Sequence, residues 1–501
     1  MKFKIKGENI EQNKEIKKEE KDLKNIKKNK KYTVNFYTLG CRTNTYETFA
    51  MMAQLKKAGF NIVPWENKAD FSIVNSCSVT NMSERKTRQV IRGERKKNPK
   101  GNYICIGCYS QHAKPGEIDA DLILGNNEKL EIDKYINEYI KEKNIKPENE
   151  NIKEEFVSDI FEDRKYKEYS YNSNYIEEIR TRAIVKIQDG CDRFCTYCII
   201  PFLRGRVRSR KPENILDEIK VHVQNGAKEV VLTGIHMSSY GKDFEEKDKD
   251  QEKNEESKQY ENIHNLVNLL EQIDKIEGLE RIRIGSLEPR VITDEFISRI
   301  KKLKKLCPQF HLSLQSACDE TLKRMKRKYT IEEYMLSVKK LKEEILDARI
   351  TTDVMVGFPG ETEEEFNETY ENLKKLKLFK MHVFKYSKRD GTIAAKMKDQ
   401  VDGNIKNIRS KKLLELNRKN ALEYLEKDLG RELEVLMEQE KNGIYFGYTK
   451  NYTKIGIKEE EILKRFKGEN VINEIIKVKA KSIENKDKKD SGEFYLLSEI
   501  I

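Results

Sequence analysis

The sequence predicts an α/β multidomain protein, with an N-terminal parallel βα domain, a central TIM-like (β/α)6 partial barrel and a small C-terminal antiparallel β-barrel. Three observations lead to this fold class. The chain has 501 residues, more than one hydrophobic core usually organises. Short apolar runs alternate with helical patterns over two long stretches, as in parallel sheets. From Arg431 onward, five short strand-like runs replace the helical patterns.

The N-terminal domain is predicted at residues 32–140. The runs VNFYTL, FSIVNS and YICIG are typical of buried strands, and helical spacing appears between them in TYETFAMMAQLKKAGF and MSERKTRQVIRGERKKN. This βαβαβ order indicates a parallel sheet. Residues 1–31 are rich in Lys, Glu and Asn and are predicted to be disordered. KEKNIKPENENIKEE has a similar composition and begins a linker placed at 141–176.

Six strand and helix units are predicted over residues 177–410, with strands at AIVKIQ, EVVLTG, RIRIGS, QFHLSLQ, TTDVMVGF and MHVFKY. The charged segment DFEEKDKDQEKNEESKQYE, near 243–261, is predicted to be a solvated loop insertion. A long amphipathic helix is predicted near 404–428. Residues 411–430 are predicted to form the helix that connects the partial barrel to the C-terminal domain. The C-terminal domain at 431–501 has strand candidates RELEVLMEQ, GIYFGYTK, YTKIGIK, VINEIIKVKAKSI and EFYLLSEII.

The composition favours a cytoplasmic protein with reduced cysteines. Nine cysteines, an odd count in a long chain, argue against a disulfide scaffold. The N-terminus lacks the apolar run of a secretory signal, and no segment approaches the about 18 apolar residues of a membrane span. Lys plus Arg number 98 and Asp plus Glu 86. Clusters within this basic excess favour a polyanionic partner such as nucleic acid, with a solvated surface as the alternative.

Three single cysteines each follow a predicted strand of the N-terminal domain. Cys41 follows VNFYTLG, Cys77 follows FSIVNS and Cys108 ends YICIGC. The carboxyl ends of parallel strands share one edge of a sheet, so we expect these thiols on the same rim, where they form a candidate metal site. Buried free cysteine is the alternative, and it is the interpretation of the remaining cysteines, which are Cys105, Cys307 and Cys318.

A second group, Cys191, Cys195 and Cys198, lies within eight residues directly after the first predicted barrel strand. Structural zinc would need four protein ligands, and no fourth Cys or His lies close in sequence. Iron–sulfur clusters accept thiolates at such spacings, and three ligands leave one iron open for a substrate. A redox CxxC hinge is the alternative, but it gives Cys191 no role.

The segment CDRFCTYC resembles the CxxxCxxC loop of radical S-adenosylmethionine (SAM) enzymes. With TLGCRTNTYET upstream, and HLSLQSACDETLKRMKRKYT and DVMVGFPGETEEEF downstream, the chain resembles the methylthiotransferases of that group from about Tyr32 to the C-terminus. TLGC with the following N-x-YE run, and RGRVRSR, most resemble the branch that modifies N6-threonylcarbamoyladenosine (t6A) at position 37 of tRNA. Cys318 stands where glycine is expected, and Asp390 where proline is expected.

The resemblance implies two 4Fe–4S clusters. One, held by Cys191, Cys195 and Cys198, would chelate SAM at its open iron and generate a radical. The other, an auxiliary cluster on Cys41, Cys77 and Cys108, would carry the sulfur inserted at C2 of the adenine. SAM would serve as both methyl donor and radical source, and a reductant and a sulfur donor would be needed. At the carboxyl ends of barrel strands, the expected SAM contacts are Thr233, Gly234, Ser286, Glu288, Gln315 and Asp353.

The implied partner is tRNA, bound at adenosine 37 of the anticodon loop. Arg204, Arg206, Arg208 and Arg210 lie beside the cysteine loop and are predicted to contact phosphates. The helix between Arg85 and Lys97 is a further basic candidate, with a solvated face as the alternative. In the tail, aromatic and basic residues alternate as in single-stranded RNA binders and resemble a TRAM domain, and the candidates are Tyr448, Lys450 and Tyr452.

The sequence therefore predicts an enzyme that converts t6A to its 2-methylthio derivative (ms2t6A). The alternatives are a sister enzyme acting on isopentenyladenosine (i6A) at position 37 or on a ribosomal-protein aspartate. An RNA-binding iron–sulfur electron-transfer protein and a zinc-stabilised RNA binder are alternatives from other classes.

Overall fold

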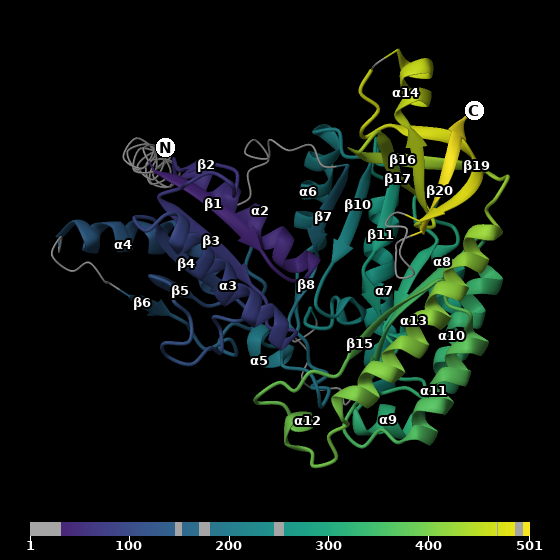
Figure 1. Ribbon diagram of the computed structural model, residues 1–501, viewed down its shortest axis with the longest axis horizontal. Helices are drawn as coiled ribbons and strands as arrows, with labels where there is room; N and C mark the ends of the chain where they lie inside the picture. Colours follow the sequence, from purple (N-terminus) through teal and green to yellow (C-terminus); the bar gives the residue numbers. More distant parts are fainter. Residues whose placement is uncertain (1–31, 146–152, 170–180, 245–254, 468, 486–493) are drawn as a thin grey trace, which may run out of the picture. The chain divides into compact units, whose positions relative to one another are not determined.

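The computed structural model describes residues 32–145, 153–169, 181–244, 255–467, 469–485 and 494–501 (Figure 1). The predicted tail at 1–31 lies outside these ranges, as do parts of the predicted linker and insertion. The described residues form two compact units. The N-terminal unit extends to Asp163 and also contains 167–169 and Phe202–Arg204, and the other described residues form the C-terminal unit. No described helix is long and apolar enough to cross a membrane.

The N-terminal unit contains a six-stranded parallel sheet with strand order β2-β1-β3-β4-β5-β6. The three predicted strands are confirmed as β1 (Thr33–Thr38), β3 (Phe71–Ser76) and β4 (Asn102–Gly107). The two predicted helices are α2 (Arg42–Lys57) and α3 (Asn81–Lys97). The sequence did not predict the remaining elements, which are β2 (Asn61–Ile62), β5 (Leu122–Leu124), a 3-10 turn (Glu128–Glu131), α4 (Ile132–Ile145) and β6 (Glu154–Phe156).

The central strands of this sheet form because they are apolar on both faces. Every residue of β3 is buried, as expected for a parallel strand covered on both sides. Helix α3 begins where the Thr80 side chain accepts a hydrogen bond from the Ser83 amide. The edge strand β6 reads EEF and lies inside the stretch predicted as a linker. Its three residues are too few and too polar to give a strand pattern.

The C-terminal unit begins with the predicted partial barrel, whose six strands are confirmed. The third strand is broken at Gly285, so that two parallel sheets result, with orders β11-β10-β7 and β12-β13-β14-β15. The strands are β7 (Arg182–Lys186), β10 (Glu229–Thr233), β11 (Arg281–Ile284), β12 (Ser286–Leu287), β13 (Gln309–Leu312), β14 (Arg349–Val356) and β15 (Lys380–Lys385). A small two-stranded sheet pairs β8 (Gln188–Asp189) with β9 (Arg208–Ser209).

Helices cover the outer face of these sheets (Figure 1). The helices of this part of the chain are α5 (Ile200–Arg204), α6 (Pro212–Gln224), α7 (Glu255–Asp274), α8 (Asp294–Ile300), α9 (Asp319–Arg324), α10 (Ile331–Glu344), α11 (Glu363–Leu376), α12 (Ile393–Lys396) and α13 (Gly403–Glu426), with 3-10 turns at Met237–Ser239 and Pro289–Val291. Thr330 and Thr362 form capping boxes with Glu333 and Glu365, which fixes where α10 and α11 begin. Helix α7 starts inside the predicted loop insertion, and its buried Leu266, Leu270 and Ile273 anchor it.

Side chains of the barrel strands alternate between two faces. Phe310 and Leu312 on β13, and Ile350 and Val354 on β14, belong to the core cluster that packs beneath the helices. Because successive side chains of a strand point to opposite faces, the residues between them face the inside of the partial barrel. This inner face carries polar side chains, and it contains the carboxyl strand ends where a ligand site is expected.

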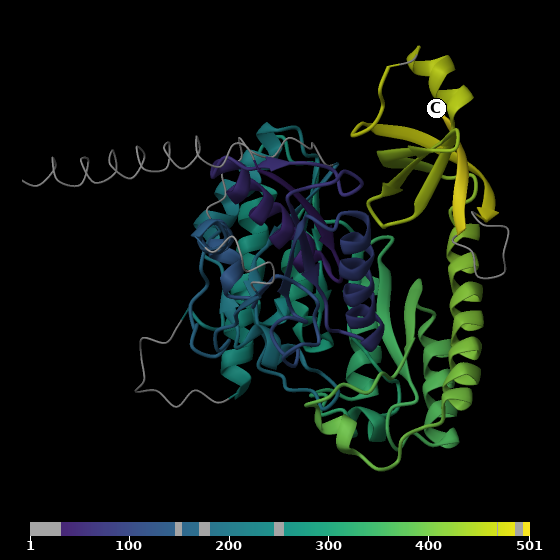
Figure 2. The ribbon, with the colours of Figure 1, turned by 60° about the vertical axis from the view of Figure 1, so that its left-hand side comes forward.

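The tail folds into a closed barrel with strand order β16-β17-β18-β20-β19, drawn in yellow at the end of α13 (Figure 2). All five predicted strands are confirmed, as β16 (Glu432–Lys441), β17 (Ile444–Thr449), β18 (Lys454–Lys458), β19 (Ile475–Asn485) and β20 (Phe494–Ile500). Helix α14 (Glu459–Phe466) was not predicted. The pairs are antiparallel except β18 with β20. A closed ring of an odd number of strands cannot be antiparallel throughout, so one parallel pair is required.

Candidate active site

The cysteine loop of the C-terminal unit lies between β8 and α5 and folds tightly onto the chain that follows it. Gly190 has φ +72°, and a Cβ there would lie 1.8 Å from the carbonyl oxygen of Arg206. The amide of Cys191 donates to the Gly205 carbonyl at 3.0 Å, and the amide of Cys198 donates to the Cys195 carbonyl at 2.9 Å. Only glycine fits at position 190. This turn brings the three thiols together.

The thiols of Cys191 and Cys198 in this loop are difficult to ionise without a cation. Burial, with added repulsion from the neighbouring Cys195, raises the pKa of Cys191 and of Cys198 to about 12 each. The Arg327 guanidinium donates to the Cys195 Sγ at 3.4 Å, and the Arg193 amide donates to the Cys191 Sγ at 3.4 Å. Cys195 is buried and Cys191 and Cys198 are half-buried. A group of thiols with few hydrogen-bond donors fits a bound metal centre, which would stabilise the thiolates.

The distances between the sulfur atoms distinguish a site for a single zinc ion from a site for an iron–sulfur cluster. Within the described residues, one group of three His, Cys, Asp or Glu side chains has all its ligand atoms within 4.8 Å, and it contains no cysteine. Tetrahedral zinc, with Zn–S bonds of about 2.3 Å, would hold its sulfurs about 3.8 Å apart. Neither cysteine group is that compact. Both fit a polynuclear iron–sulfur cluster better than a single zinc ion.

Glu288, a predicted SAM contact, connects the end of β12 to the cysteine loop. Its carboxylate lies 2.5 Å from Arg193 Nη2, 3.2 Å from His236 Nε2 and 3.8 Å from Arg327 Nη2. Burial alone would raise the pKa of Glu288, but His236 and the two arginines hold it well below its ordinary value. The ionised carboxylate therefore fixes the loop and Arg327 around the cysteines.

Gln315 is the predicted SAM contact with the clearest sign of a missing partner. Its φ is +75°, and its buried side-chain Oε1 has no hydrogen-bond partner among the described residues. Its backbone is held in place by the Asp353 carbonyl at 2.9 Å and by the Met355 amide at 2.8 Å. Strained backbone and an orphaned buried acceptor are costly and commonly mark a ligand site. The residue fits a contact to a polar ligand such as SAM.

The other predicted SAM contacts lie along the same inner face or at strand ends. Thr233 ends β10, and its carbonyl accepts from the Ile187 amide at 2.9 Å. Gly234 packs on Gln188, whose Oε1 would be 3.0 Å from an added Cβ. Ser286 is exposed and stands opposite His311 in the strand register. Asp353 has a histidine on its carboxylate, because His311 Nε2 lies 3.3 Å from its Oδ2.

The first cysteine group converges at one edge of the N-terminal sheet, as its positions predict. Cys41, Cys77 and Cys108 follow the adjacent strands β1, β3 and β4. Burial raises the pKa of Cys77, and repulsion from Cys108 and Cys41 adds to the increase, so the three thiols are close enough to interact. Cys77 and Cys108 are buried, whereas Cys41 is exposed. This arrangement fits a cluster with one side accessible.

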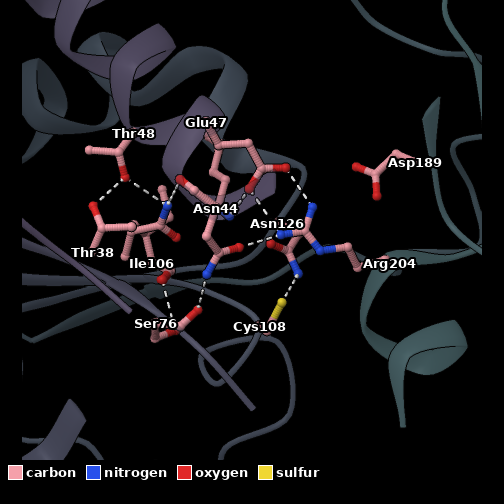
Figure 3. Close-up of polar contacts among 12 residues, drawn as sticks. Thr38, Asn44, Glu47, Thr48, Ser76, Ile106, Cys108, Asn126, Asp189 and Arg204 are labelled. Carbon is pink, nitrogen blue, oxygen red and sulfur yellow. Dashed lines mark hydrogen bonds and ion pairs between the residues drawn. The ribbon is translucent and has the colours of Figure 1, made fainter. Parts of the chain in front are cut away.

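A buried charge network lies beside Cys108 (Figure 3). Glu47 on α2 accepts hydrogen bonds from Lys129 at 2.5 Å and from Arg204 Nη2 at 3.0 Å. Asn126 donates to the Leu203 carbonyl at 2.8 Å and approaches the Cys108 Sγ at 3.8 Å. Lys129 and Arg204 are at most 1% exposed. The network therefore places two cations and an amide donor around the thiol site.

The basic run after the cysteine loop is mostly buried, which corrects its predicted role. Arg204 pairs with Glu47, Arg210 pairs with Glu218 on α6, and Arg208 Nη2 lies 3.8 Å from Asp189. These guanidiniums have structural roles in place of the predicted phosphate contacts. Arg206 is the exception, because its side chain is 53% exposed. The sequence could not separate these residues, since their acidic partners come from distant segments.

The predicted RNA-binding rings of the tail pack against arginines of the partial barrel. Tyr448 and Tyr452 are stacked with their centroids 4.6 Å apart. Arg182 lies over the Tyr448 ring at 5.1 Å and Arg283 over the Tyr452 ring at 4.7 Å. The carbonyl of Lys450 accepts from Arg283 Nη1 at 3.3 Å. The two rings therefore stabilise the packing of the tail barrel, and cation–π contacts occupy part of their surface.

The sequence interpretation missed a polar cluster on the inner face of the last three strands, formed by His311, Asp353 and His382. A signal for it was present. His311 and His382 interrupt the apolar patterns of QFHLSLQ and MHVFKY at positions that alternate with core residues. Arg327, which donates to the Cys195 Sγ, left no such signal because it lies in the chain between α9 and α10, far from the cysteine loop in sequence.

Comparisons with known proteins agree with this geometry. A model of the radical SAM superfamily matches residues 185–373, and a model described as Uncharacterized protein family UPF0004 matches residues 33–124. The chain is 41% identical to Threonylcarbamoyladenosine tRNA methylthiotransferase MtaB of Bacillus subtilis, over 89% of this chain and 93% of that protein. The protein of the same name in Aquifex aeolicus is 38% identical over 85% of this chain and 96% of that protein.

A third relative bears a different name. The tRNA-2-methylthio-N(6)-dimethylallyladenosine synthase of Thermoanaerobacter pseudethanolicus is 35% identical over 85% of this chain and 86% of that protein. With its cysteine loop at the start of an open parallel barrel, this chain belongs to the radical SAM methylthiotransferase family. Membership implies SAM and a 4Fe–4S cluster as cofactors.

Proposed function

We propose that this protein inserts a methylthio group at C2 of t6A at position 37 of tRNA, converting t6A to ms2t6A. The observation that carries the proposal is the 41% identity, over 89% of this chain, to the Bacillus subtilis enzyme named for threonylcarbamoyladenosine. The two cysteine sites support it, because the reaction needs one centre that activates SAM and another that supplies sulfur.

In the C-terminal unit, Cys191, Cys195 and Cys198 would hold the first 4Fe–4S cluster. With SAM bound, this cluster supplies the 5′-deoxyadenosyl radical. The protein's contribution is to position and shield the site. Arg327 donates to Cys195, Glu288 ties Arg327 and Arg193 together, and Gln315 offers a buried acceptor to SAM. Thr233 and Ser286 would add polar contacts at the strand ends.

In the N-terminal unit, Cys41, Cys77 and Cys108 would hold a second 4Fe–4S cluster that carries the sulfur to be inserted. Asn126 Nδ2 lies 3.8 Å from the Cys108 Sγ and offers that sulfur a hydrogen bond. Exposure of Cys41 leaves one side of the site open to a sulfur donor. The reaction needs a sulfur donor and a reductant, which we infer from its chemistry. We place the reaction in the cytoplasm, where both would meet tRNA.

A reconstitution experiment tests the proposal. The purified protein, with both clusters rebuilt anaerobically, is incubated with SAM, dithionite, sulfide and a tRNA carrying t6A. The same tRNA carrying i6A is the matched substrate. We expect ms2t6A by mass spectrometry of the digested tRNA, and little product from i6A. Product from i6A alone would move the protein to the activity named for the Thermoanaerobacter relative.

A further inference from the structure

Apart from the SAM contact predicted for Asp353, the polar cluster of His311, Asp353 and His382 has no role in the function proposed above. Its members come from the adjacent strands β13, β14 and β15, and their ligand atoms lie within 4.8 Å of one another. The two imidazole centroids are 5.9 Å apart, and Asp353 stands opposite His382 in the strand register. All three face the inside of the partial barrel, away from the helices.

Hydrogen bonds fix the orientation of the inner half of this cluster. Gln309 Nε2 donates to the Thr351 hydroxyl at 3.1 Å, and that hydroxyl lies 3.0 Å from His311 Nδ1. The other ring nitrogen of His311, Nε2, lies 3.3 Å from Asp353 Oδ2. The imidazole of His311 therefore lies between the Thr351 hydroxyl and the Asp353 carboxylate and holds that carboxylate in place.

The outer half of the cluster is accessible to solvent. The side chains of His311 and Asp353 are 15% and 32% exposed, and His382 is exposed. Burial would raise the pKa of Asp353, yet the hydrogen bond from His311 and the charges of both histidines lower it. His382 stands opposite Asp353 in the strand register. Lys380, two residues away on the same face of β15, adds a positive charge.

An exposed aromatic ring completes the surface. Phe384 follows His382 by two residues on the same face of β15, nearer the carboxyl end of the strand, and it is 36% exposed. Its ring offers a purine a stacking partner. Strand β15 thus presents a cation, an imidazole and an aromatic ring in a row on its inner face. This combination fits a base that carries an anionic substituent.

We propose that His382, positioned by Asp353 and His311, binds the carboxylate of the N6-threonylcarbamoyl group, while Phe384 contacts the purine ring. The inference rests on the proposed function and adds a specificity determinant to it. The isopentenyl group of i6A is a hydrocarbon and offers no acceptor to the His382 imidazole or the Lys380 ammonium. Sites that read a polar group reject analogues lacking that group, because the polar contacts made with the correct substrate are lost.

The test compares His382→Gln with the wild type as holoenzymes that contain both clusters. The substrates are tRNA with t6A, the same tRNA with the threonyl carboxylate converted to its methyl ester, and tRNA with i6A. We expect the substitution to raise the KM for the t6A substrate about 10- to 100-fold, the range of a charge-assisted hydrogen bond, with kcat changing less. The methyl ester should be a poor substrate for the wild type, and the substitution should affect it little.

Lys385→Gln is the matched control, because Lys385 lies on the same strand but bonds to Asn407 on α13. We expect wild-type kinetics from it. If His382→Gln still cleaves SAM without methylthiolating tRNA, its barrel is folded. Asp353→Asn provides a second variant, for which we expect the same loss of t6A selectivity. Equal use of t6A and its methyl ester by the wild type would overturn the inference. Failure of the wild type on t6A would overturn the proposed function instead.

The same three side chains resemble a site for a divalent cation, and the experiment distinguishes that case. Metals other than iron are measured in the wild type and in His382→Gln. A stoichiometric divalent metal that is lost with His382 would assign the cluster to metal binding and contradict direct recognition of the carboxylate. We expect no such metal in either protein.

Discussion

The two cysteine sites are built in opposite ways. Cys41, Cys77 and Cys108 are far apart in sequence, and the parallel register of β1, β3 and β4 brings them together. Cys191, Cys195 and Cys198 lie in one loop, whose shape depends on Gly190 and on a close contact with the backbone of Arg206. The first site therefore exists only in the folded sheet, whereas the second depends on local backbone geometry.

The surroundings of the two sites differ in a related way. In the N-terminal unit, a buried network of Glu47, Lys129 and Arg204 supports the site, and breaking it leaves an uncompensated charge. In the C-terminal unit, the Glu288 carboxylate contacts Arg193 and His236 beside the loop. Substitutions near the first site should therefore lower the stability of the N-terminal unit. Substitutions near the second site should instead impair cluster assembly and SAM binding.

The largest expected difference comes from removing one cysteine at each site. Cys195→Ala should abolish both SAM cleavage and methylthiolation, because it removes a ligand of the radical-generating cluster. Cys77→Ala should abolish methylthiolation but retain SAM cleavage. Chromatography with mass spectrometry measures 5′-deoxyadenosine and ms2t6A in the same reaction. Loss of SAM cleavage in Cys77→Ala would contradict the separation of roles.

The next difference concerns two neighbouring arginines. Arg204→Leu should destabilise the N-terminal unit by about 3–5 kcal/mol, since it leaves Glu47 and Lys129 buried with one cation missing. Arg206→Leu should change stability by no more than about 0.5 kcal/mol, because its side chain is 53% exposed. Urea unfolding measures both. Equal losses for the two variants would show that Arg204 is not the buried partner of Glu47.

A smaller loss is expected from the turn before the cysteine loop. Gly190→Ala should cost about 2 kcal/mol or more, because φ is +72° and the new Cβ meets a backbone carbonyl that cannot rotate away. About half of the iron should be lost as well, because the other cluster site is in a different unit. Gly403→Ala is the control, since nothing lies within 4 Å of its Cβ position. Full iron content in Gly190→Ala would contradict the local origin of the loop.

The smallest expected effect concerns tRNA binding by the exposed arginine of the basic run. Arg206→Gln should weaken tRNA binding to a similar degree for t6A and i6A substrates, because a phosphate contact carries no base information. The dependence of log K on log salt should become shallower by about one unit or slightly less. Filter binding at several salt concentrations measures this slope. An unchanged slope would exclude Arg206 from the tRNA interface.

The strands and the places of the cysteines at their ends were predictable because their signals are local. Apolar runs marked β1, β3 and β4, and each cysteine came directly after such a run or inside a short loop. The short strands β2, β5 and β6 were missed because two or three residues give no period. Gln315 and Glu288 were also predictable as candidates, because each lies at the carboxyl end of a predicted barrel strand.

The roles of charged residues were not predictable to the same degree. Arg204 and Arg206 look alike in RGRVRSR, yet Arg204 pairs with a glutamate 157 positions away. The same holds for His311 and Asp353, which are on different strands and meet only when the partial barrel forms. Such contacts depend on tertiary structure, so the sequence indicates candidates without distinguishing buried partners from exposed binding groups.

The most direct test of the account is mass spectrometry of tRNA nucleosides from cells with and without the gene. We expect ms2t6A to disappear when the gene is deleted and t6A to accumulate in its place, while methylthiolated i6A is unchanged. Wild-type protein should restore ms2t6A, and Cys195→Ala should not. Unchanged ms2t6A in the deleted strain, or loss of the methylthio group from i6A alone, would contradict the proposed substrate.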